Sequence, residues 1–304
     1  MHNSFSIVIP LYNKADQIER CLCSVLNQSY DNYEIIIIND GSTDNSLNIV
    51  SKFKSKKIKL ISQKNKGVSI ARNYGVLNSK NKYICFLDAD DSYESDFLSE
   101  VNILINKFPN FGMYATNNYF ISSKGGRKIN YNNEELLYFE IENLFKMYND
   151  MDRMPFSNSN ICVNKTIFNQ LNGYAENVKL TEDSDLFLKF YLTSKIAYLN
   201  KPLSNYYYET AGNTLGVIEN GDSYVSKQIQ SKLNNKQISS KDIIEAHRFI
   251  ANQQINVIKK LLLNGKNIKA FMRCFDMKII KIYPLRAIAN LFYCFLPVYY
   301  IKRL

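Results

Sequence analysis

Short apolar runs alternate with amphipathic segments through the first 91 residues, and this alternation constrains the fold more than any other feature. The apolar runs have the length and composition of buried strands and cover residues 5–10, 34–40, 58–63 and 83–91. The segments between them are expected to be helices, at 16–26, in the part that follows the turn at 41, and at 67–79. A continuous apolar run such as EIIIIND suits a parallel sheet that is covered on both faces. The order therefore predicts a doubly wound, mostly parallel α/β sheet.

Three of these expected strands end in a proline or in acidic residues. These residues are Pro10, Asp40 and the acidic group at 88–91. In open α/β sheets, ligands bind beyond the carboxyl ends of the strands. We therefore expect three segments that are distant in the sequence to converge on one crevice.

The run FLDADD at 86–91 places Asp88, Asp90 and Asp91 within four positions. Mutual repulsion disfavours such a cluster, and a divalent cation bound together with a diphosphate would relieve it. Hard oxygen ligands suit Mn²⁺ or Mg²⁺. The alternative is a solvated acidic turn with helix-capping duties, in which Asp91 only starts the next helix. The position after a buried strand in this alternation favours the ligand site.

The motif NDGSTD at 39–44 allows a functional and a structural interpretation. Asp40 could accept hydrogen bonds from a base or a ribose. Gly41 permits a tight turn, and Ser42 or Thr43 is expected to cap the next helix. Taken alone, the motif fits either interpretation equally well.

The middle of the chain, from 110 to 215, is less regular. Strands are expected near 111–121 and 159–163, with a loop-rich stretch at 122–158. The stretch TEDSDLFLKFYL at 181–192 predicts a helix with Thr181 as its N-cap. Glu182 and Asp183 at its start could simply compensate the helix dipole. They have a catalytic role only if this helix start faces the same crevice.

The residues or motifs that several common catalytic and binding mechanisms require are missing from this sequence. The chain has two histidines, His2 and His247, so a general base is expected to be a carboxylate. Neither GxGxxG after the first strand nor GxxxxGK[ST] occurs, which excludes the usual dinucleotide and P-loop turns. The six cysteines form no CxxC pair, which argues against a zinc site and fits reduced cytosolic thiols. No signal-peptide pattern is expected at the N-terminus.

The net charge of +10 is concentrated at the C-terminal end. Residues 251–304 contain ten Lys or Arg against the single acid Asp276, so nine of the ten net positive charges lie there. The expected catalytic region is therefore close to neutral. This distribution argues against nucleic acid as a partner, because a nucleic-acid-binding module would spread basic residues over the sheet domain.

Four ordered motifs together resemble the family 2 glycosyltransferases. They are SIVIPLYNKADQIERCLCSVLNQSYDNYEIIIINDGSTDNS, NKGVSIARNYG, YICFLDADD and LTEDSDLFLKF. The resemblance covers about residues 4–215. It implies the GT-A fold, a Rossmann-like doubly wound sheet. It also implies a nucleotide-diphosphate sugar as donor, most often UDP-linked, and inversion of the anomeric centre in a single displacement.

The resemblance also implies roles in nucleotide binding for individual residues. Pro10 and Tyr12 correspond to residues that frame the uracil, and Asp40 to the acid that reads the base. Arg72 corresponds to a basic residue near the nucleotide. Asp88 corresponds to the acid beside the ribose.

The resemblance also implies roles in the reaction for two further residues. Asp90 corresponds to the ligand of Mn²⁺ or Mg²⁺, and Asp183 corresponds to the catalytic base. An inverting transfer needs one base for the acceptor hydroxyl, and a metal stabilises the charge of the departing UDP. Many members carry a Tyr-Arg-x-His-like stretch after the last core strand. Here NYYYET at 205–210 has neither Arg nor His, so that metal or diphosphate contact has no obvious counterpart.

These observations predict a catalytic domain at 1–215, with a nucleotide-binding half at 1–91 and an acceptor half at 92–215. The expected activity is transfer of a hexose or N-acetylhexosamine from a UDP-sugar to a glycan acceptor, lipid-linked, in cell-surface polysaccharide synthesis. The expected location is the cytoplasm, peripheral at the inner face of the cell membrane. The alternatives are a nucleotidyltransferase on a related α/β fold and a non-enzymatic basic module that binds membrane or nucleic acid.

Residues 216–304 are expected to form a basic helical extension, with helices at 241–263 and 266–282 and an apolar end at 287–301 interrupted by Pro297. One interpretation is that its basic and aromatic residues contact an anionic membrane surface. Another is that the helices pack on the catalytic domain with solvated lysines. The apolar end is about 15 residues long, short of the roughly 20 that cross a bilayer.

Overall fold

The computed structural model describes residues 2–122, 126–131, 137–178, 180–208 and 223–295. The chain divides into two compact units. The first unit comprises Met1–Glu142 with Pro155–Asn213, and the second comprises Asn143–Met154 with Thr214–Leu304. Each unit is described by itself.

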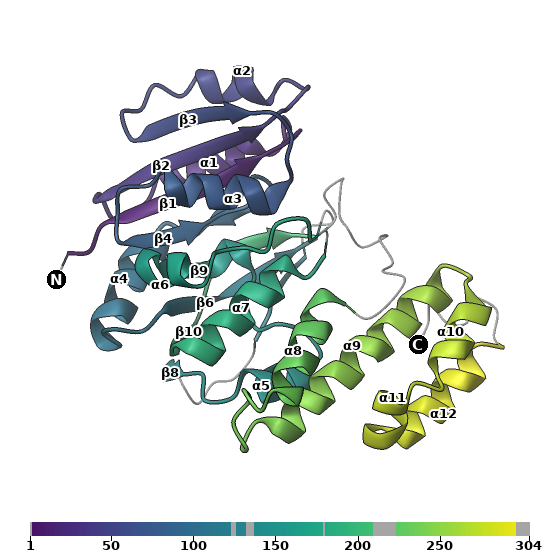
Figure 1. The fold of residues 1–304 in the computed structure, drawn as a ribbon. Coiled ribbons are helices and arrows are strands. Elements are labelled where there is room, and N and C mark those ends of the chain that lie inside the picture. Colours follow the sequence, from purple (N-terminus) through teal and green to yellow (C-terminus); the bar gives the residue numbers. More distant parts are fainter. Residues whose placement is uncertain (1, 123–125, 132–136, 179, 209–222, 296–304) are drawn as a thin grey trace. The chain divides into compact units, whose positions relative to one another are not determined.

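A ten-stranded sheet forms the centre of the first unit, in the order β3-β2-β1-β4-β9-β6-β10-β5 (Figure 1). Its first four strands in this order are mutually parallel: Ile58–Gln63 (β3), Tyr33–Asp40 (β2), Phe5–Leu11 (β1) and Tyr83–Phe86 (β4). This confirms the expected doubly wound α/β architecture. Continuous apolar runs such as that of β2 are buried because helices cover both faces of this part of the sheet.

The remaining strands make the second half of the sheet mixed. They are Ser92–Tyr93 (β5), Met113–Ile121 (β6), Arg127–Ile129 (β7), Tyr138–Glu140 (β8), Ile161–Asn164 (β9) and Ile196–Tyr207 (β10). β9 runs antiparallel to β4 and to β6, whereas β10 runs parallel to β6. β7 and β8 pair with β6 and β10 from the stretch expected to be loop-rich. The expected strands near 111–121 and 159–163 are confirmed as β6 and β9.

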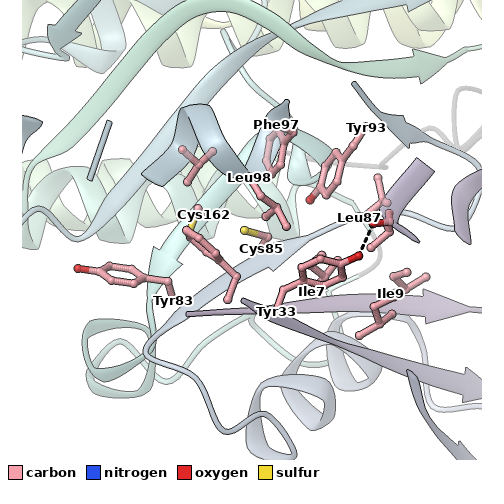
Figure 2. Packing of buried hydrophobic residues seen from close by; sticks show 14 of the residues in the cluster. Ile7, Ile9, Tyr33, Tyr83, Cys85, Leu87, Tyr93, Phe97, Leu98 and Cys162 are labelled. Carbon is pink, nitrogen blue, oxygen red and sulfur yellow. Dashed lines mark hydrogen bonds between the residues drawn. The ribbon is translucent and has the colours of Figure 1, made fainter. Parts of the chain in front are cut away.

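Alternate residues of the central strands face different helices, as the period of a strand requires. The helices of this unit are Ile18–Leu26 (α1), Ser46–Ser51 (α2), Val68–Leu77 (α3), Phe97–Lys107 (α4), Lys165–Gln170 (α6) and Glu182–Thr193 (α7). Ile7 and Ile9 of β1 share one core cluster with the buried residues of α1 and with Phe97 and Leu98 of α4 (Figure 2). On the other face, Val8 lies directly against Gly75 of α3.

Gly75 is required at this point by packing. A Cβ built at Gly75 would lie 2.3 Å from Cγ1 of Val8. Since Val8 is fully buried in the centre of the sheet, it has little room to move away. The missing side chain therefore lets α3 approach the sheet closely, which places the residues of α3 against the end of β4.

One expected strand boundary is wrong, and one expected helix cap is at its predicted position but lacks its side-chain hydrogen bond. The strand expected at 83–91 ends at Phe86, because Asp91 N–H donates to the carbonyl of Asp88 (2.9 Å) and closes a turn. Thr181 precedes α7, but it has a φ of 65° and its side chain makes no capping hydrogen bond. Instead, Oδ1 of Asp183 accepts from the N–H of Ser184 (2.6 Å) within the first turn.

The second unit is helical. It contains Leu144–Met151 (α5), Tyr224–Asn234 (α8), Ile243–Leu263 (α9), Asn267–Arg273 (α10), Met277–Ile282 (α11) and Pro284–Tyr293 (α12). α5 joins this unit although it lies within the 1–215 segment, because Phe145 and Tyr148 pack on Phe249 of α9. No helix in the described ranges is long and apolar enough to cross a membrane. Pro297 lies outside the described residues.

Candidate active site

The carboxyl ends of β1, β2 and β4 meet at one edge of the sheet, because these three strands are adjacent and parallel. Pro10 lies near the end of β1, where it pairs in register with Ile38. Tyr12 follows the strand and is 47% exposed. The structure therefore leaves an aromatic ring accessible at the sheet edge, where it can stack on a planar base.

Asp40 ends β2 and is buried, and its carboxylate shapes the loop that leads into α3. Oδ1 accepts hydrogen bonds from the side chain of Gln63 (2.7 Å) and the N–H of Lys66 (2.9 Å). Oδ2 accepts from the N–H of Gly67 (2.8 Å), a residue whose φ of 93° suits glycine. Asp40 thus positions the 63–67 loop at the same sheet edge as Tyr12.

The turn after Asp40 departs from the expected capping. The next helix, α2, begins at Ser46, too far along for Ser42 or Thr43 to cap it. Asp44 is the residue that accepts from the N–H of Ser46 (3.0 Å). The N–H of Thr43 donates to the side chain of Asn13 (2.8 Å), which ties this turn to the loop after β1.

Arg72 connects two of the acidic motifs. Its guanidinium is buried on α3, with Nη2 2.6 Å from Oδ1 of Asp88 and Nη1 3.2 Å from Oε1 of Glu182. Burial acts to lower the pKa of Arg72, but the charge of Asp88 and further contributions from Tyr174 and Glu182 raise it overall. The guanidinium therefore stays charged and holds the start of α7 beside the end of β4.

The acid pair at the start of α7 thus faces the site. Burial, and then the neighbouring charge of Asp183, raise the pKa of Glu182, while Arg72 opposes that shift. Asp183 is half-buried, and its Oδ1 is held by the N–H and hydroxyl of Ser184. Glu182 forms an ion pair with Arg72, whereas Asp183 forms no ion pair with that guanidinium.

The three acids of FLDADD have different environments. Asp88 pairs with Arg72, and Oδ2 of Asp90 lies 2.6 Å from Nζ of Lys14. Asp91 is almost fully buried and accepts from the hydroxyl of Ser159. Burial raises the pKa of Asp91 well above its usual range, and the charges of Asp88 and Asp90 add to that effect.

The expectation that Asp91 starts the next helix is wrong. β5 follows it directly, and α4 begins only at Phe97, after Asp96. Oδ1 of Asp91 accepts from the N–H of Tyr207 (3.2 Å) at the end of β10. Asp91 therefore joins the acidic loop to the end of β10, where the stretch NYYYET begins.

The 205–208 segment lies against the acids. Burial raises the pKa of Tyr206 to about 12, and the charges of Asp91, Asp88, Asp90 and Asp183 contribute in that order. The guanidinium of Arg20 stacks 3.5 Å from the ring centroid of Tyr207. Glu209 and Thr210 lie outside the described residues.

Lys14, Arg20, Ser159 and Tyr207 were not predicted from the sequence as site residues. Arg20 donates to the carbonyl of Asp90, and Ser159 donates to Asp91 and accepts from the N–H of Asp88. Each of these contacts joins segments at least 68 positions apart. The only signal for Lys14 is its place in the loop after an expected strand end, and Arg20 lies within the helix that follows that loop.

Among the described residues, no group of three or more His, Cys, Asp and Glu side chains could hold a metal ion. Asp90 nevertheless offers hard carboxylate oxygens, is 19% exposed and already attracts the ammonium of Lys14. Mg²⁺ commonly takes one or two protein carboxylates and completes its shell with substrate phosphates and water. The donor set therefore fits a cation that binds together with a diphosphate, and it does not fit an all-protein cage.

The fold and this cluster of acids are those expected of a glycosyltransferase, and comparison with known proteins agrees. Residues 6–162 match the Glycosyl transferase family 2 profile. The matched part is over half of the chain, so the protein belongs to glycosyltransferase family 2. Residues 1–349 of Staphylococcus aureus TarS, in complex with UDP-GlcNAc, have the same GT-A fold, with a TM-score of 0.62. The identity is 17%, over 94% of this chain and 91% of that one.

Curated relatives such as the following two match about two thirds of the chain. Glycosyltransferase GlyA of Streptococcus pneumoniae serotype 4 is 32% identical over 224 residues, which cover 67% of this chain and 30% of that protein. Chondroitin synthase of Pasteurella multocida is 31% identical over 209 residues, covering 64% of this chain and 20% of the synthase. The chain therefore spans less than a third of the length of these relatives.

Proposed function

We propose that this protein is an inverting glycosyltransferase that moves a hexose or an N-acetylhexosamine from a UDP-sugar to a glycan acceptor. The observation that carries the proposal is the bridge of Arg72 between Asp88 and Glu182. It unites a candidate donor-binding acid after β4 with a candidate base at the start of α7. The TarS fragment of the same fold is described in complex with UDP-GlcNAc, which supports a UDP-sugar as donor.

The donor would bind along the carboxyl edge of β1, β2 and β4. Tyr12 offers an exposed ring for the uracil, with Pro10 behind it at the strand end. The carboxylate of Asp40 accepts hydrogen bonds from the 63–67 loop. It would therefore position the uracil through that loop, or bind the uracil directly after one of these hydrogen bonds breaks. Asp88, 29% exposed and fixed by Arg72, is placed to accept from a ribose hydroxyl.

Asp183 would act as the general base. An inverting displacement requires a group that takes the proton of the acceptor hydroxyl as the new glycosidic bond forms and the bond to UDP breaks. Asp183 is half-buried, and its orientation is fixed by Ser184. Glu182 is held in its ion pair with Arg72 and would keep the start of α7 in place.

Mn²⁺ or Mg²⁺ would be held by Asp90 together with the donor's diphosphate, and it would supply positive charge to the departing UDP. The protein contributes the positioning of that carboxylate. Arg20 fixes the Asp90 carbonyl, and Asp91 anchors the loop to β10. The segment that corresponds to the family's Tyr-Arg-x-His-like stretch contains Tyr206, Tyr207 and Tyr208 instead, so a tyrosine hydroxyl would be the substitute for that contact.

A donor screen tests the proposed reaction. UDP release is measured with Mn²⁺ for UDP-Glc, UDP-Gal, UDP-GlcNAc and UDP-GalNAc. The variant Asp183→Asn is expected to be inactive, and Asp150→Asn is the matched control, in which an acid away from the site is replaced. Asp150 is an exposed acid of α5 in the second unit. We expect one donor to be turned over by the wild type and by Asp150→Asn. Equal UDP release by Asp183→Asn would overturn the assignment of the base.

We further propose that the acceptor is a lipid-linked surface glycan and that the protein works at the cytoplasmic face of the membrane. Polysaccharide synthases among the relatives support a growing glycan as acceptor. In the second unit, Ile268, Phe271 and Met272 expose one face of α10, and the ring of Phe271 lies 5.8 Å from that of Phe295. Leu285 and Phe295 are 81% and 76% exposed, and so extend this apolar surface beyond α10.

Basic residues accompany this surface. Lys269 follows Ile268, and Arg286 follows Leu285, each exposed at its position. Aromatic and aliphatic side chains with basic neighbours suit the interface of an anionic bilayer. An anionic membrane is thus the proposed partner of the α10–α12 region.

Liposome flotation tests the membrane proposal. The variant Ile268→Ser/Leu285→Ser is compared with Leu77→Ser/Ile103→Ser, which removes two exposed aliphatic residues from the first unit. We expect the wild type and the control to float with anionic vesicles but not with neutral ones, and the α10–α12 variant to stay in the soluble fraction. Equal recovery of wild type with and without anionic vesicles would sink the proposal.

A further inference from the structure

Lys14 forms an ion pair with the carboxylate that the proposed function assigns to a divalent cation. Its Nζ lies 2.6 Å from Oδ2 of Asp90, and the two side chains are 21% and 19% exposed. Lys14 belongs to the loop after β1, and Asp90 to the loop after β4. Since β1 and β4 are adjacent and parallel, the two loops meet at the same sheet edge. The ammonium therefore stands where the cation would approach Asp90.

Both partners are held in place by their backbones. The N–H of Lys14 donates to the hydroxyl of Ser46 (3.0 Å), and its carbonyl accepts from the N–H of Ile18 (2.9 Å) at the start of α1. The carbonyl of Asp90 accepts from Arg20. The backbones from which the two side chains extend are therefore fixed at the same sheet edge.

An ammonium and a divalent cation cannot share one carboxylate oxygen without strong repulsion. When a cation binds Asp90, Lys14 has to move. The diphosphate of a bound donor gives it a new anionic partner close by, and lysine is a common phosphate ligand.

We propose that Lys14 competes with the divalent cation for Asp90 and is released to the donor's diphosphate when the cation binds. This inference rests on the proposed function, since it takes Asp90 as the metal ligand. It implies that cation and nucleotide bind cooperatively. The cation alone binds weakly because Lys14 holds its ligand, and the nucleotide relieves that competition.

The test measures Mn²⁺ affinity from the electron paramagnetic resonance signal of free Mn²⁺, with and without UDP. Lys14→Met removes the ammonium and keeps the length of the side chain, whereas Lys14→Arg keeps the charge. Lys80→Met is the matched control, because Lys80 pairs with Glu34 near the start of β2, at the opposite edge of the sheet. Asp90→Asn removes the proposed ligand.

Without UDP, we expect Lys14→Met to bind Mn²⁺ about three- to fivefold more tightly than wild type, on the scale of a partly shielded ion pair. Lys14→Arg and Lys80→Met should bind as wild type does. With UDP, the gain should disappear, and Lys14→Met should bind UDP more weakly than wild type. The enhancement of Mn²⁺ binding by UDP is therefore smaller in Lys14→Met.

Two other outcomes overturn the inference in distinguishable ways. If Lys14→Met and wild type bind Mn²⁺ equally without UDP, while Asp90→Asn loses Mn²⁺ binding with UDP, the competition is wrong and the metal role of Asp90 stands. If Asp90→Asn binds Mn²⁺ with UDP as well as wild type does, the metal role itself is wrong, and the competition is wrong with it.

Discussion

Nη2 of Arg72 lies 2.6 Å from Oδ1 of Asp88, so a residue of α3 holds the acid that follows β4. The same guanidinium reaches Glu182 at the start of α7. One buried cation therefore joins three elements of the first unit, and its removal leaves two carboxylates without compensation.

Replacing Arg72 with Met should destabilise the protein by roughly 3–5 kcal/mol, the usual effect of removing one partner from a buried ion pair. Arg72→Lys should recover only part of this, because an ammonium lacks the planar fork that contacts two carboxylates at once. Urea unfolding monitored by circular dichroism measures both. Arg127→Met is the control, since Arg127 forms an exposed pair with Glu94. A stability loss for Arg72→Met no larger than that of the control would contradict the bridge.

Asp183→Asn and Glu182→Gln should separate the two acids of α7. We expect Asp183→Asn to lower kcat by roughly 10²- to 10⁴-fold, the range for a general base, with UDP affinity retained. Glu182→Gln should lower stability and UDP affinity through Arg72 while keeping most of kcat. Steady-state kinetics and calorimetry of UDP binding measure the split. The reverse pattern would make Glu182 the base.

Asp90→Ala should abolish the dependence of UDP binding on Mn²⁺. Asp90 is partly exposed, and its Oδ2 faces the ammonium of Lys14, whereas Asp88 is held by the buried guanidinium of Arg72. Calorimetric titration with UDP in Mn²⁺ and in EDTA measures the effect, and Asp96→Ala serves as control because Asp96 precedes α4 and pairs with Lys201. Unchanged enhancement by Mn²⁺ in Asp90→Ala would count against the metal role.

Asp91→Asn should make stability less dependent on pH. Burial first, and then Asp88 and Asp90, raise the pKa of Asp91 in the folded protein, whereas the unfolded value is about 4. A raised carboxyl pKa contributes most stability below the unfolded value and loses it as pH rises towards the folded value. The wild type should therefore lose more unfolding free energy than Asp91→Asn between about pH 4 and 8. Parallel slopes in urea unfolding across that range would refute this.

Gly75→Ala should destabilise the protein by about 1–3 kcal/mol, because the new methyl group would lie 2.3 Å from Cγ1 of Val8. Val8→Ala should recover part of that loss when combined with Gly75→Ala, since it opens the space that the methyl group needs. Thermal unfolding of the single and double variants provides the cycle. Strict additivity of the two losses would show that the contact does not limit the approach of α3 to the sheet.

The sequence by itself determined the parallel half of the sheet. Its four apolar runs are long enough for strands and too short for membrane spans, and local hydrophobic burial decides where each strand lies. The helix bounds of α1, α3 and α7 agree with the predicted ranges to within two residues for the same reason. The order of motifs also placed the chain in its family.

Tertiary structure alone decided how the acids differ from one another. Asp88, Asp90 and Asp91 are equivalent in the run FLDADD, and their separate environments come from Arg72, Lys14, Ser159 and Tyr207, which lie between 16 and 116 positions away. Such contacts depend on which loops the sheet brings together. Local pattern carries no information about them, because ion pairing and burial act between residues that are neighbours only in the folded chain.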